Sequence, residues 1–369
     1  MPRLADEFEL RLVRFASALI DQQRASIVVP PQQPAPGFWF GGGNLTLGPD
    51  GALYLVGRYR NVGDSRTGLG AGERGLELAI FLSGNCGQSF QKYVSFSKAD
   101  LDVGDRRVLS IEGAALHWTD DGVELFVSSE KEGIGYPPGF ESFLKPGTGV
   151  WTIERSAARS IEKLKDAAFE TVFAGSDPAV MHVKDPVCYD APSGDCVLMY
   201  CTHPYCWSSS NSAYAIRRRG AAAFGASCFD FFPRGCTWDI AITRGTCIVD
   251  VPQVGPFSDR NVSLLFYDGG ESLRNFDEHS AAVKRPRGYS CEELGGVAYF
   301  LNGDLSRVYR LSKYQPMFVS PQGTGCSRYV DVLSTPGGIY ATWQQSQRDL
   351  SQPLVMNFVD REQAEKTLG

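Results

Sequence analysis

The chain has 369 residues, a net charge of −6 and a sequence pI near 5.4. This acidic balance, without a stripe of Lys and Arg, argues against a nucleic-acid partner. No apolar run reaches the roughly 18 residues of a membrane span, so we expect no membrane partner. The N-terminus also lacks the features of a signal peptide, which favours a cytoplasmic protein, or a secreted one whose signal has been removed.

The chain opens with a segment of helical periodicity, Asp6 to Gln23, whose apolar residues fall mainly on one side. We expect this helix to pack against the rim of the fold that follows. A Pro- and Gln-rich stretch, Val29 to Gly37, then separates the helix from the rest of the chain. The sequence therefore predicts an N-terminal helix and linker in residues 1–36, followed by a single domain in residues 37–369.

Five hairpin turns follow at intervals of about 72 residues, each leading into a strand rich in Leu, Tyr and Phe. The turns are Asp50-Gly51, Asp121-Gly122, Ser193-Gly194, Ser258-Asp259 and Gly337-Gly338. A lone twisted sheet cannot bury both of its apolar faces, but repeated sheets can stack radially around an axis. The repeat therefore predicts an all-β fold, a five-bladed β-propeller.

A short motif after the first hairpin marks an outer turn of the first blade. Its residues follow the pattern Ser, any, Asn or Asp, any, Gly, any, Ser or Thr, aromatic: Ser83, Asn85, Gly87, Ser89 and Phe90. The motif resembles the Asp-box of sialidases. We interpret it as structural, because Asn85 can bond the turn backbone, Gly87 can adopt a positive φ and Phe90 can anchor the hairpin.

Acidic residues precede four of the five hairpins, at the strands expected to approach the axis. They are Glu112, Asp185, Asp250 and Asp331, whereas the first blade presents only Asn44. Cleavage of a glycosidic bond needs one protonated and one ionised carboxyl, and crowded acids help to keep one of them protonated. We take Asp185, Asp250 and Glu112 as catalytic candidates. Each could instead be a turn cap or an inter-blade ion pair.

Two segments, Lys184-Asp185-Pro186 and Glu112-Gly113 with Leu116, resemble motifs of the five-bladed glycoside hydrolases. The five-bladed glycoside hydrolases in question are family 43, the fructan hydrolases and the family 130 mannoside enzymes. The resemblance implies that Asp185 orients substrate and that Glu112 is the general acid. In family 43 that acid lies on blade four, where this chain has Asp250, and the blade-one base has no counterpart here. The resemblance implies a glycosidase, inverting by analogy, acting on an oligo- or polysaccharide.

Further polar and aromatic residues are candidates for holding a sugar, because sugar sites combine stacking platforms with donors for hydroxyls or carboxylates. The substrate-binding candidates are Asn44, Arg58, His203, Trp207, Asp268, Arg328, Asp331 and Trp343. A Trp is equally suited to the core between blades, and a His more often serves as a simple hydrogen-bonding group.

Three other functions remain open. A sialidase-like enzyme would place Arg58, Arg60 and Arg328 around Tyr329, and a polysaccharide lyase or a non-catalytic carbohydrate-binding propeller would share the fold. The ten cysteines lack a matched second cluster, so we expect them to be reduced and structural and expect no metal or other cofactor. A central Ca²⁺ is compatible with axial carboxylates. The oligomeric state is left open.

Overall fold

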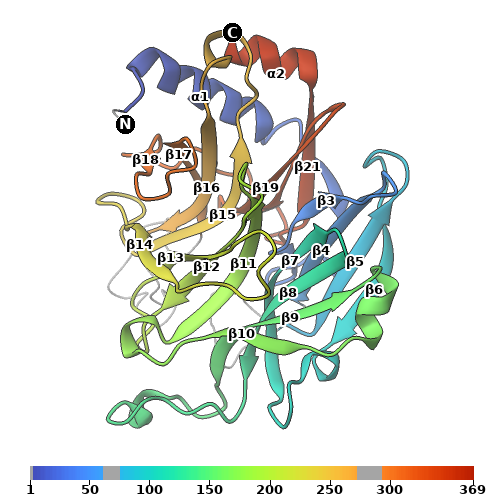
Figure 1. Cartoon of the computed structure of the whole chain (residues 1–369), viewed down its shortest axis with the longest axis vertical. Coiled ribbons are helices and arrows are strands. Elements are labelled where there is room, and N and C mark those ends of the chain that lie inside the picture. Colours follow the sequence, from blue (N-terminus) through green and yellow to red (C-terminus); the bar gives the residue numbers. More distant parts are fainter. Residues whose placement is uncertain (1–2, 61–74, 272–292) are drawn as a thin grey trace.

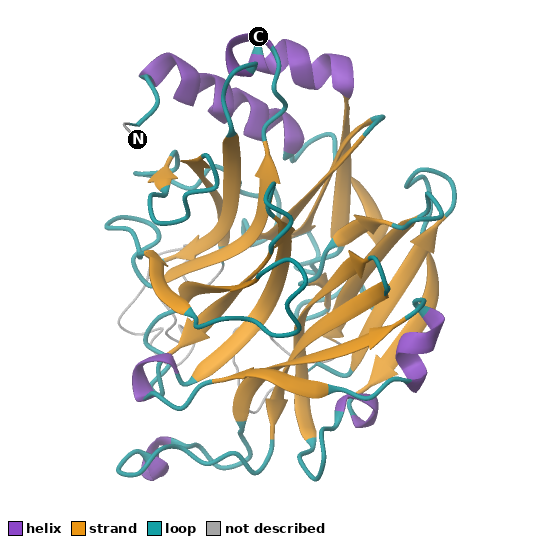
Figure 2. Cartoon of the chain, in the orientation of Figure 1, coloured by secondary structure: helices purple, strands orange, loops and turns teal. Residues whose placement is uncertain are grey.

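A computed structural model of the chain describes residues 3–60, 75–271 and 293–369. Five antiparallel sheets make up the fold, and each predicted turn lies in the connection between two paired strands of one sheet. The five-bladed β-propeller is therefore confirmed. Most of the molecule consists of strands, and the N- and C-terminal helices lie together at one edge (Figure 1, Figure 2). No helix in the described ranges is long and apolar enough to span a membrane.

The first three blades follow the chain from their inner to their outer strand. Blade one differs in that two short inner strands pair with the same neighbour. The strands are β2 (Trp39–Gly41), β3 (Leu45–Leu47), β4 (Leu53–Arg60), β5 (Glu77–Ser83) and β6 (Gln91–Ser97) in blade one, β7 (Val108–Thr119), β8 (Gly122–Lys131), β9 (Val150–Ala158) and β10 (Glu170–Ala174) in blade two, and β11 (His182–Asp190), β12 (Cys196–His203), β13 (Asn211–Arg217) and β14 (Cys228–Phe232) in blade three.

The last two blades complete the ring. Their strands are β15 (Ile242–Asp250), β16 (Val262–Gly270), β17 (Leu294–Leu301) and β18 (Tyr309–Arg310) in blade four, and β19 (Ser327–Thr335), β20 (Gly338–Gln345), β21 (Leu354–Asp360) and β1 (Ser26–Val29) in blade five. The outer strand of blade five thus comes from the other end of the chain, where Ser26 pairs with Met356. This strand lies within residues 1–36, which the sequence analysis described only as helix and linker.

The two terminal helices cover one edge of blades four and five. Helix α1 (Asp6–Leu19) lies beside α2 (Arg361–Leu368), as Figure 1 shows in blue and red. Leu12, Phe15 and Leu19 of α1 are buried in the same apolar core as Trp343. Helix α1 thus packs against the propeller by burying its apolar face.

The outer turn between β5 and β6 is built as its motif predicts. The Gly87 amide donates to the Ser83 hydroxyl at 2.9 Å, and the Ser89 amide donates to the Asn85 side-chain oxygen at 3.0 Å. Gly87 has a φ of 81°, a value that favours glycine. The motif therefore stabilises a hairpin on the outside of blade one.

The inner strand of each blade has a break in its pairing with the next strand, a few residues after the inner strand begins. β7, β11, β15 and β19 have register shifts at Ile111/Ala114, Lys184/Val187, Gly245/Cys247 and Arg328/Asp331, and blade one is interrupted between β2 and β3. Such bulges bend a strand and redirect side chains, often beside active sites. The four bulged strands therefore bring Glu112, Asp185, Arg244 and Tyr329 toward the same end of the axis.

Candidate functional site

Charged side chains surround the ring of Tyr329 at this end of the propeller axis. They come from all five blades, and with Tyr329 we call them the central cluster: Arg58, Glu112, Lys184, Asp185, Arg244, Asp268, Glu293 and Arg328. Arg58, Arg244 and Arg328 lie 4.5–5.3 Å from the centre of the Tyr329 ring. Opposite charges are present in equal number, so the cluster is close to neutral when every group is ionised.

Asp185 is held in one orientation by several contacts. The Gly113 amide donates to its Oδ1 at 3.0 Å, and Arg244 donates to its Oδ2 at 3.1 Å. Its backbone has a φ of 56°, which residues other than glycine rarely adopt and which is often found at functional sites. Burial would raise the pKa of Asp185, but the positive charges of Lys184 and Arg244 outweigh burial and hold the pKa well below its usual range.

Glu112 is more accessible than Asp185, with a side chain that is 14% exposed against 5%. Arg58 donates to its Oε2 at 3.0 Å, and the Ser110 hydroxyl donates to its Oε1 at 3.0 Å. Burial opposes ionisation of Glu112, yet the charges of Arg58 and Lys184 lower its pKa below the usual value. These charges thus favour the ionised form of Glu112 in the free protein.

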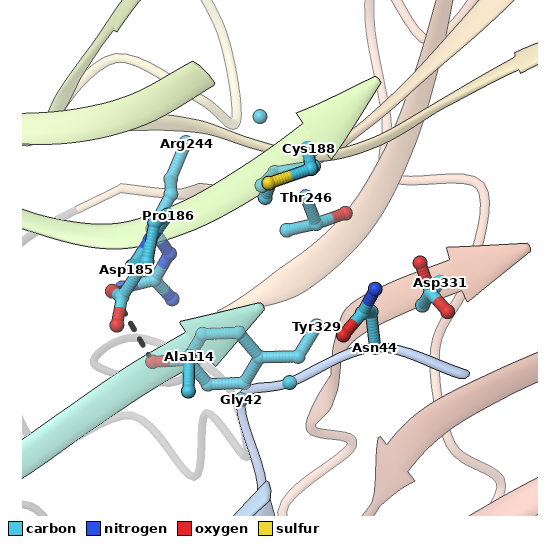
Figure 3. A pocket seen from close by; sticks show the side chains of 13 residues that line it. Gly42, Asn44, Ala114, Asp185, Pro186, Cys188, Arg244, Thr246, Tyr329 and Asp331 are labelled. Carbon is cyan, nitrogen blue, oxygen red and sulfur yellow. Dashed lines mark hydrogen bonds and ion pairs between the residues drawn. The ribbon is translucent and has the colours of Figure 1, made fainter. Parts of the chain in front are cut away.

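Glu112 and Asp185 are joined through Arg58 and Tyr329. Arg58 Nη2 lies 3.0 Å from Glu112 and 3.2 Å from the Tyr329 hydroxyl, which lies 3.5 Å from Asp185. Figure 3 shows Asp185, Arg244 and Tyr329 pointing toward one another. These three contacts place the carboxyl oxygens of Glu112 and Asp185 within about 10 Å of each other, the range in which two carboxyls can act on one glycosidic bond.

Arg244 connects three carboxylates from blades three and four. Besides Asp185, it contacts Asp268 at 2.9 Å and Glu293 at 2.8 Å, and it is almost completely buried. Asp268 also accepts a hydrogen bond from the Tyr329 amide at 3.0 Å. Burial raises the pKa of Asp268 to about 7 even beside Arg244, so this carboxyl can hold a proton near neutral pH.

Of the predicted binding residues, Arg58, Asp268 and Arg328 belong to the central cluster, and two others lie beside it. The Trp207 ring is centred 4.3 Å from His203, and the Lys184 ammonium lies 5.8 Å from the Trp207 ring centre. Trp207 is partly exposed, whereas His203 is buried. Trp207 also stacks on His182, with ring centres 4.2 Å apart, so it already packs against two histidines.

The structure does not bring Asp250 into the central cluster. Asp250 ends β15, six residues after Arg244, or about 20 Å along an extended strand. There its carboxylate accepts hydrogen bonds from Tyr189 at 2.8 Å and Ser263 at 2.7 Å. The reason for the difference is the first hairpin of blade four, whose connection between β15 and β16 is long enough to include a 3₁₀ turn, Gly255–Phe257.

Trp343 also lies away from the cluster. Its side chain is fully buried under α1, and its indole N–H donates to Gln22 at 3.1 Å. A large aromatic ring at this position stabilises the contact between the helix and the propeller. Trp343 therefore takes the alternative role of a core residue.

Asn44 and Asp331 lie deeper along the axis and link neighbouring blades (Figure 3). Asn44 exchanges two hydrogen bonds with the backbone of Leu116, at 2.8 and 2.9 Å, and Asp331 accepts one from the Leu45 amide at 2.7 Å. They border a narrow cavity of about 20 Å³, enough for about one water molecule, that also reaches Asp185. Their polar groups are largely used in holding the ring together.

The sequence analysis did not identify Arg244 or Glu293 as site residues. Its sialidase-like alternative placed Arg58, Arg60 and Arg328 around Tyr329, whereas the three arginines next to that ring are Arg58, Arg244 and Arg328. Hairpin spacing pointed to Asp250, because it lies eight residues before its turn, as Asp185 does, and Glu112 lies nine before its own. The segment Arg244-Gly245-Thr246 offered a different signal, a glycine directly after a charged residue as in Glu112-Gly113. Glu293 stands just before β17, where no strand pattern marks it.

Comparisons with known proteins support the fold. Neither the family models nor the curated proteins contain a match to this chain. Among solved structures, a glycoside hydrolase is 11% identical, with 96% of each chain covered and a TM-score of 0.62. A thermostable family-43 glycoside hydrolase is 10% identical, covering 89% of this chain and 91% of its own, with a TM-score of 0.56.

The β-1,2-mannobiose phosphorylase of Listeria innocua is also similar, at 10% identity, with 94% of this chain and 93% of its own covered and a TM-score of 0.53. Hydrolysis and phosphorolysis thus both occur on this architecture, and at such low identity the likeness extends to the fold alone. The chain is a five-bladed β-propeller of the kind that glycoside hydrolases use.

Proposed function

We propose that this chain hydrolyses a glycosidic bond of an oligo- or polysaccharide at the central cluster. The observation that carries the proposal is the pair Glu112 and Asp185, two carboxyls from neighbouring blades within about 10 Å of each other. Inverting glycosidases separate their carboxyls by about 6.5–9.5 Å to leave room for a water molecule. The upper limit of about 10 Å allows this separation, and we take inversion by analogy with the resembling hydrolases; the reaction needs no cofactor.

The two carboxyls differ in how strongly their surroundings stabilise the ionised form. Asp185 is more deeply buried, and the Gly113 amide, Lys184 and Arg244 all stabilise its charge. Glu112 lies at the exposed edge of the cluster, where a bound sugar would displace water and make ionisation less favourable. In the proposed reaction Glu112 takes up a proton and donates it to the leaving oxygen, while Asp185 remains ionised.

Asp185 has access to a site for the attacking water. The axial cavity has room for about one water molecule and borders Asp185, Arg244 and Tyr329. In the proposal Asp185 accepts a proton from that water as it attacks the anomeric carbon. This assignment differs from the resembling family 43, whose base lies on blade one; here Gly42, Gly43 and Asn44, none of them acidic, occupy the break between β2 and β3.

A second candidate reaction is phosphorolysis, favoured by the four cations Arg58, Lys184, Arg244 and Arg328. Guanidinium and ammonium groups are the usual partners of phosphate in proteins. Inorganic phosphate would then attack in place of water, and the protein would need to supply only the proton donor. Because each of these cations already pairs with a carboxylate, we rank this candidate below hydrolysis.

The test is an activity screen with and without inorganic phosphate. Aryl glycosides and natural oligosaccharides, including sialosides and uronides, are incubated with the chain, and the first sugar released is identified by NMR. Hydrolysis yields a free sugar of inverted anomeric configuration regardless of phosphate. A sugar phosphate that forms only with phosphate present supports the second candidate, and binding without turnover across the panel indicates a carbohydrate-binding propeller.

Matched variants locate the reaction. Glu112→Gln and Asp185→Asn keep the shape of each side chain, and each is expected to lower kcat by about 10²–10⁴. Asp250→Asn removes a carboxyl at the far end of a neighbouring blade and is expected to leave kcat unchanged. Turnover that survives both Glu112→Gln and Asp185→Asn would contradict the proposed acid pair.

A further inference from the structure

A second group of ionisable side chains lies at the opposite ends of β7, β8, β11 and β12. We call it the groove cluster: His117, Glu124, Asp190 and Cys196. It borders an open groove between blades two and three, which is also lined by Arg155 and Arg217. The cluster is separate from Glu112 and Asp185, which lie near the other ends of the same inner strands.

His117 is the centre of the groove cluster. Its Nδ1 lies 2.8 Å from Glu124 Oε2, and its Nε2 lies 2.9 Å from Asp190 Oδ1. One ligand atom from each of His117, Asp190 and Cys196 falls within 4.8 Å of the other two. Across residues 3–60, 75–271 and 293–369, no other three His, Cys, Asp or Glu side chains meet so closely.

These distances are close to those of a metal site. Zinc binds His nitrogen and carboxylate oxygen at about 2.0–2.2 Å and Cys sulfur at about 2.3 Å, so tetrahedral ligand atoms lie about 3.3–3.6 Å apart. Small side-chain movements would therefore bring the three atoms around one ion. The mixture of nitrogen, sulfur and oxygen suits Zn²⁺ or a similar divalent transition metal, and not Ca²⁺ or Mg²⁺.

Glu124 supplies the outer support that such sites use. Metal-binding His residues usually donate their other ring N–H to a carboxylate, which fixes the ring and strengthens the ligand. Glu124 takes this position at Nδ1, and it is itself fixed by Arg155 at 2.7 Å and by Arg217. The His117 ring is thereby oriented with Nε2 toward Asp190 and Cys196.

We propose that His117, Asp190 and Cys196 form a zinc-binding site that links blades two and three. The ordinary alternative is an ion-pair network, in which His117 carries both ring protons and donates to both carboxylates. In the proposal a metal ion takes the place of the proton on Nε2. Asp190 is well exposed, so the ion can enter from the groove and bind water as a further ligand. The site does not depend on glycoside cleavage.

The experiment titrates the full chain, freed of metal by chelation, with ZnCl₂ in a calorimeter, and with CoCl₂ under visible spectroscopy. We expect one equivalent of Zn²⁺ to bind with a Kd of about 1 µM or tighter. We also expect Co²⁺ to give the tetrahedral d–d bands and the thiolate charge-transfer band of a Cys ligand. A chain that binds neither ion, or a Co²⁺ spectrum without the thiolate band, overturns the proposal.

Variants decide whether the ion binds at this cluster. Cys196→Ser and Asp190→Asn should each weaken Zn²⁺ binding at least about 10-fold, and Glu124→Gln about 10–100-fold through loss of the support to His117. Cys86→Ser, an exposed thiol on blade one, is the matched control and should bind normally. Thermal unfolding without metal checks that each variant folds. Folded Cys196→Ser and Asp190→Asn that bind Zn²⁺ as tightly as the unmodified chain overturn the proposal.

Discussion

The two ends of β7 and β11 carry different chemistry on the same pair of strands. At one end Glu112 and Asp185 belong to the central cluster, where every acid faces a buried or nearly buried cation. At the other end His117 and Asp190 border an open groove, and Asp190 is largely exposed. On β7, His117 lies five positions after Glu112, and on β11, Asp190 lies five positions after Asp185. Each of these steps is about 17 Å along an extended strand.

This difference shows how a propeller separates sites. Near the central cluster the inner strands converge on the axis, so charges from all five blades meet in a small volume and must neutralise one another. At the groove cluster only two blades meet, and water reaches the Asp190 carboxylate. Charge pairing should therefore matter most at the axis and less at the groove.

The largest expected effect comes from Arg244→Met. The substitution leaves Asp185, Asp268 and Glu293 without their shared cation in a buried site, and breaking a buried pair costs about 3–5 kcal/mol. Denaturant unfolding monitored by circular dichroism measures the loss. Arg218→Met is the control, because Arg218 pairs with Asp195 at the surface and should cost less than about 1 kcal/mol. Equal losses in the two variants would argue against a buried, charge-balanced cluster.

Asp331→Asn separates burial from charge pairing, because Asp331 accepts hydrogen bonds but forms no ion pair with a cation among the residues that the structure describes. Burial raises the pKa of Asp331 to about 7 from an ordinary value near 3.8. Folding thus takes up a proton between these pH values, and the stability from that proton is complete below about pH 4 and lost as the pH rises through about 7. The variant lacks this titration.

We therefore expect Asp331→Asn to gain stability relative to the unmodified chain, by about 2–4 kcal/mol, as the pH rises from 4 to 8. Urea unfolding at several pH values measures the difference. A difference that stays constant across this range would show that Asp331 is ionised throughout.

At the groove end, Arg217→Met should have a smaller effect than Arg244→Met. Glu124 keeps its contacts with His117 and Arg155, so the loss is expected to be about 1.5 kcal/mol, the scale of a hydrogen bond to a charged group. Denaturant unfolding provides the measurement. A loss as large as that of Arg244→Met would mean that the groove end relies on charge pairing as strongly as the axis does.

The smallest expected change is that of Tyr329→Phe. The ring and its contacts with three arginines remain, while the hydroxyl contacts with Arg58 and Asp185 disappear. We expect a loss of about 0.5–1.5 kcal/mol in stability. Thermal unfolding is the measurement, and a loss above about 3 kcal/mol would show that the hydroxyl is essential to the cluster.

The sequence by itself determined the repeat and much of its local structure. Each first hairpin has its predicted turn, and the Ser83 to Phe90 motif forms its predicted outer turn, because Gly, Asn and Asp encode such turns through local backbone preferences. It also indicated Glu112 and Asp185 by their place on inner strands ahead of the hairpins, and both lie in the central cluster.

Only the tertiary structure decided which charged residue of blade four reaches the axis. Position along an inner strand depends on the length of the following connection and on the register across the sheet, and neither is local. Arg244 is therefore central and Asp250 peripheral, although Asp250 has the expected spacing from its turn. The tertiary structure also decided that β1 completes blade five. Pairing between the two ends of a chain leaves no signal in the sequence of either end alone.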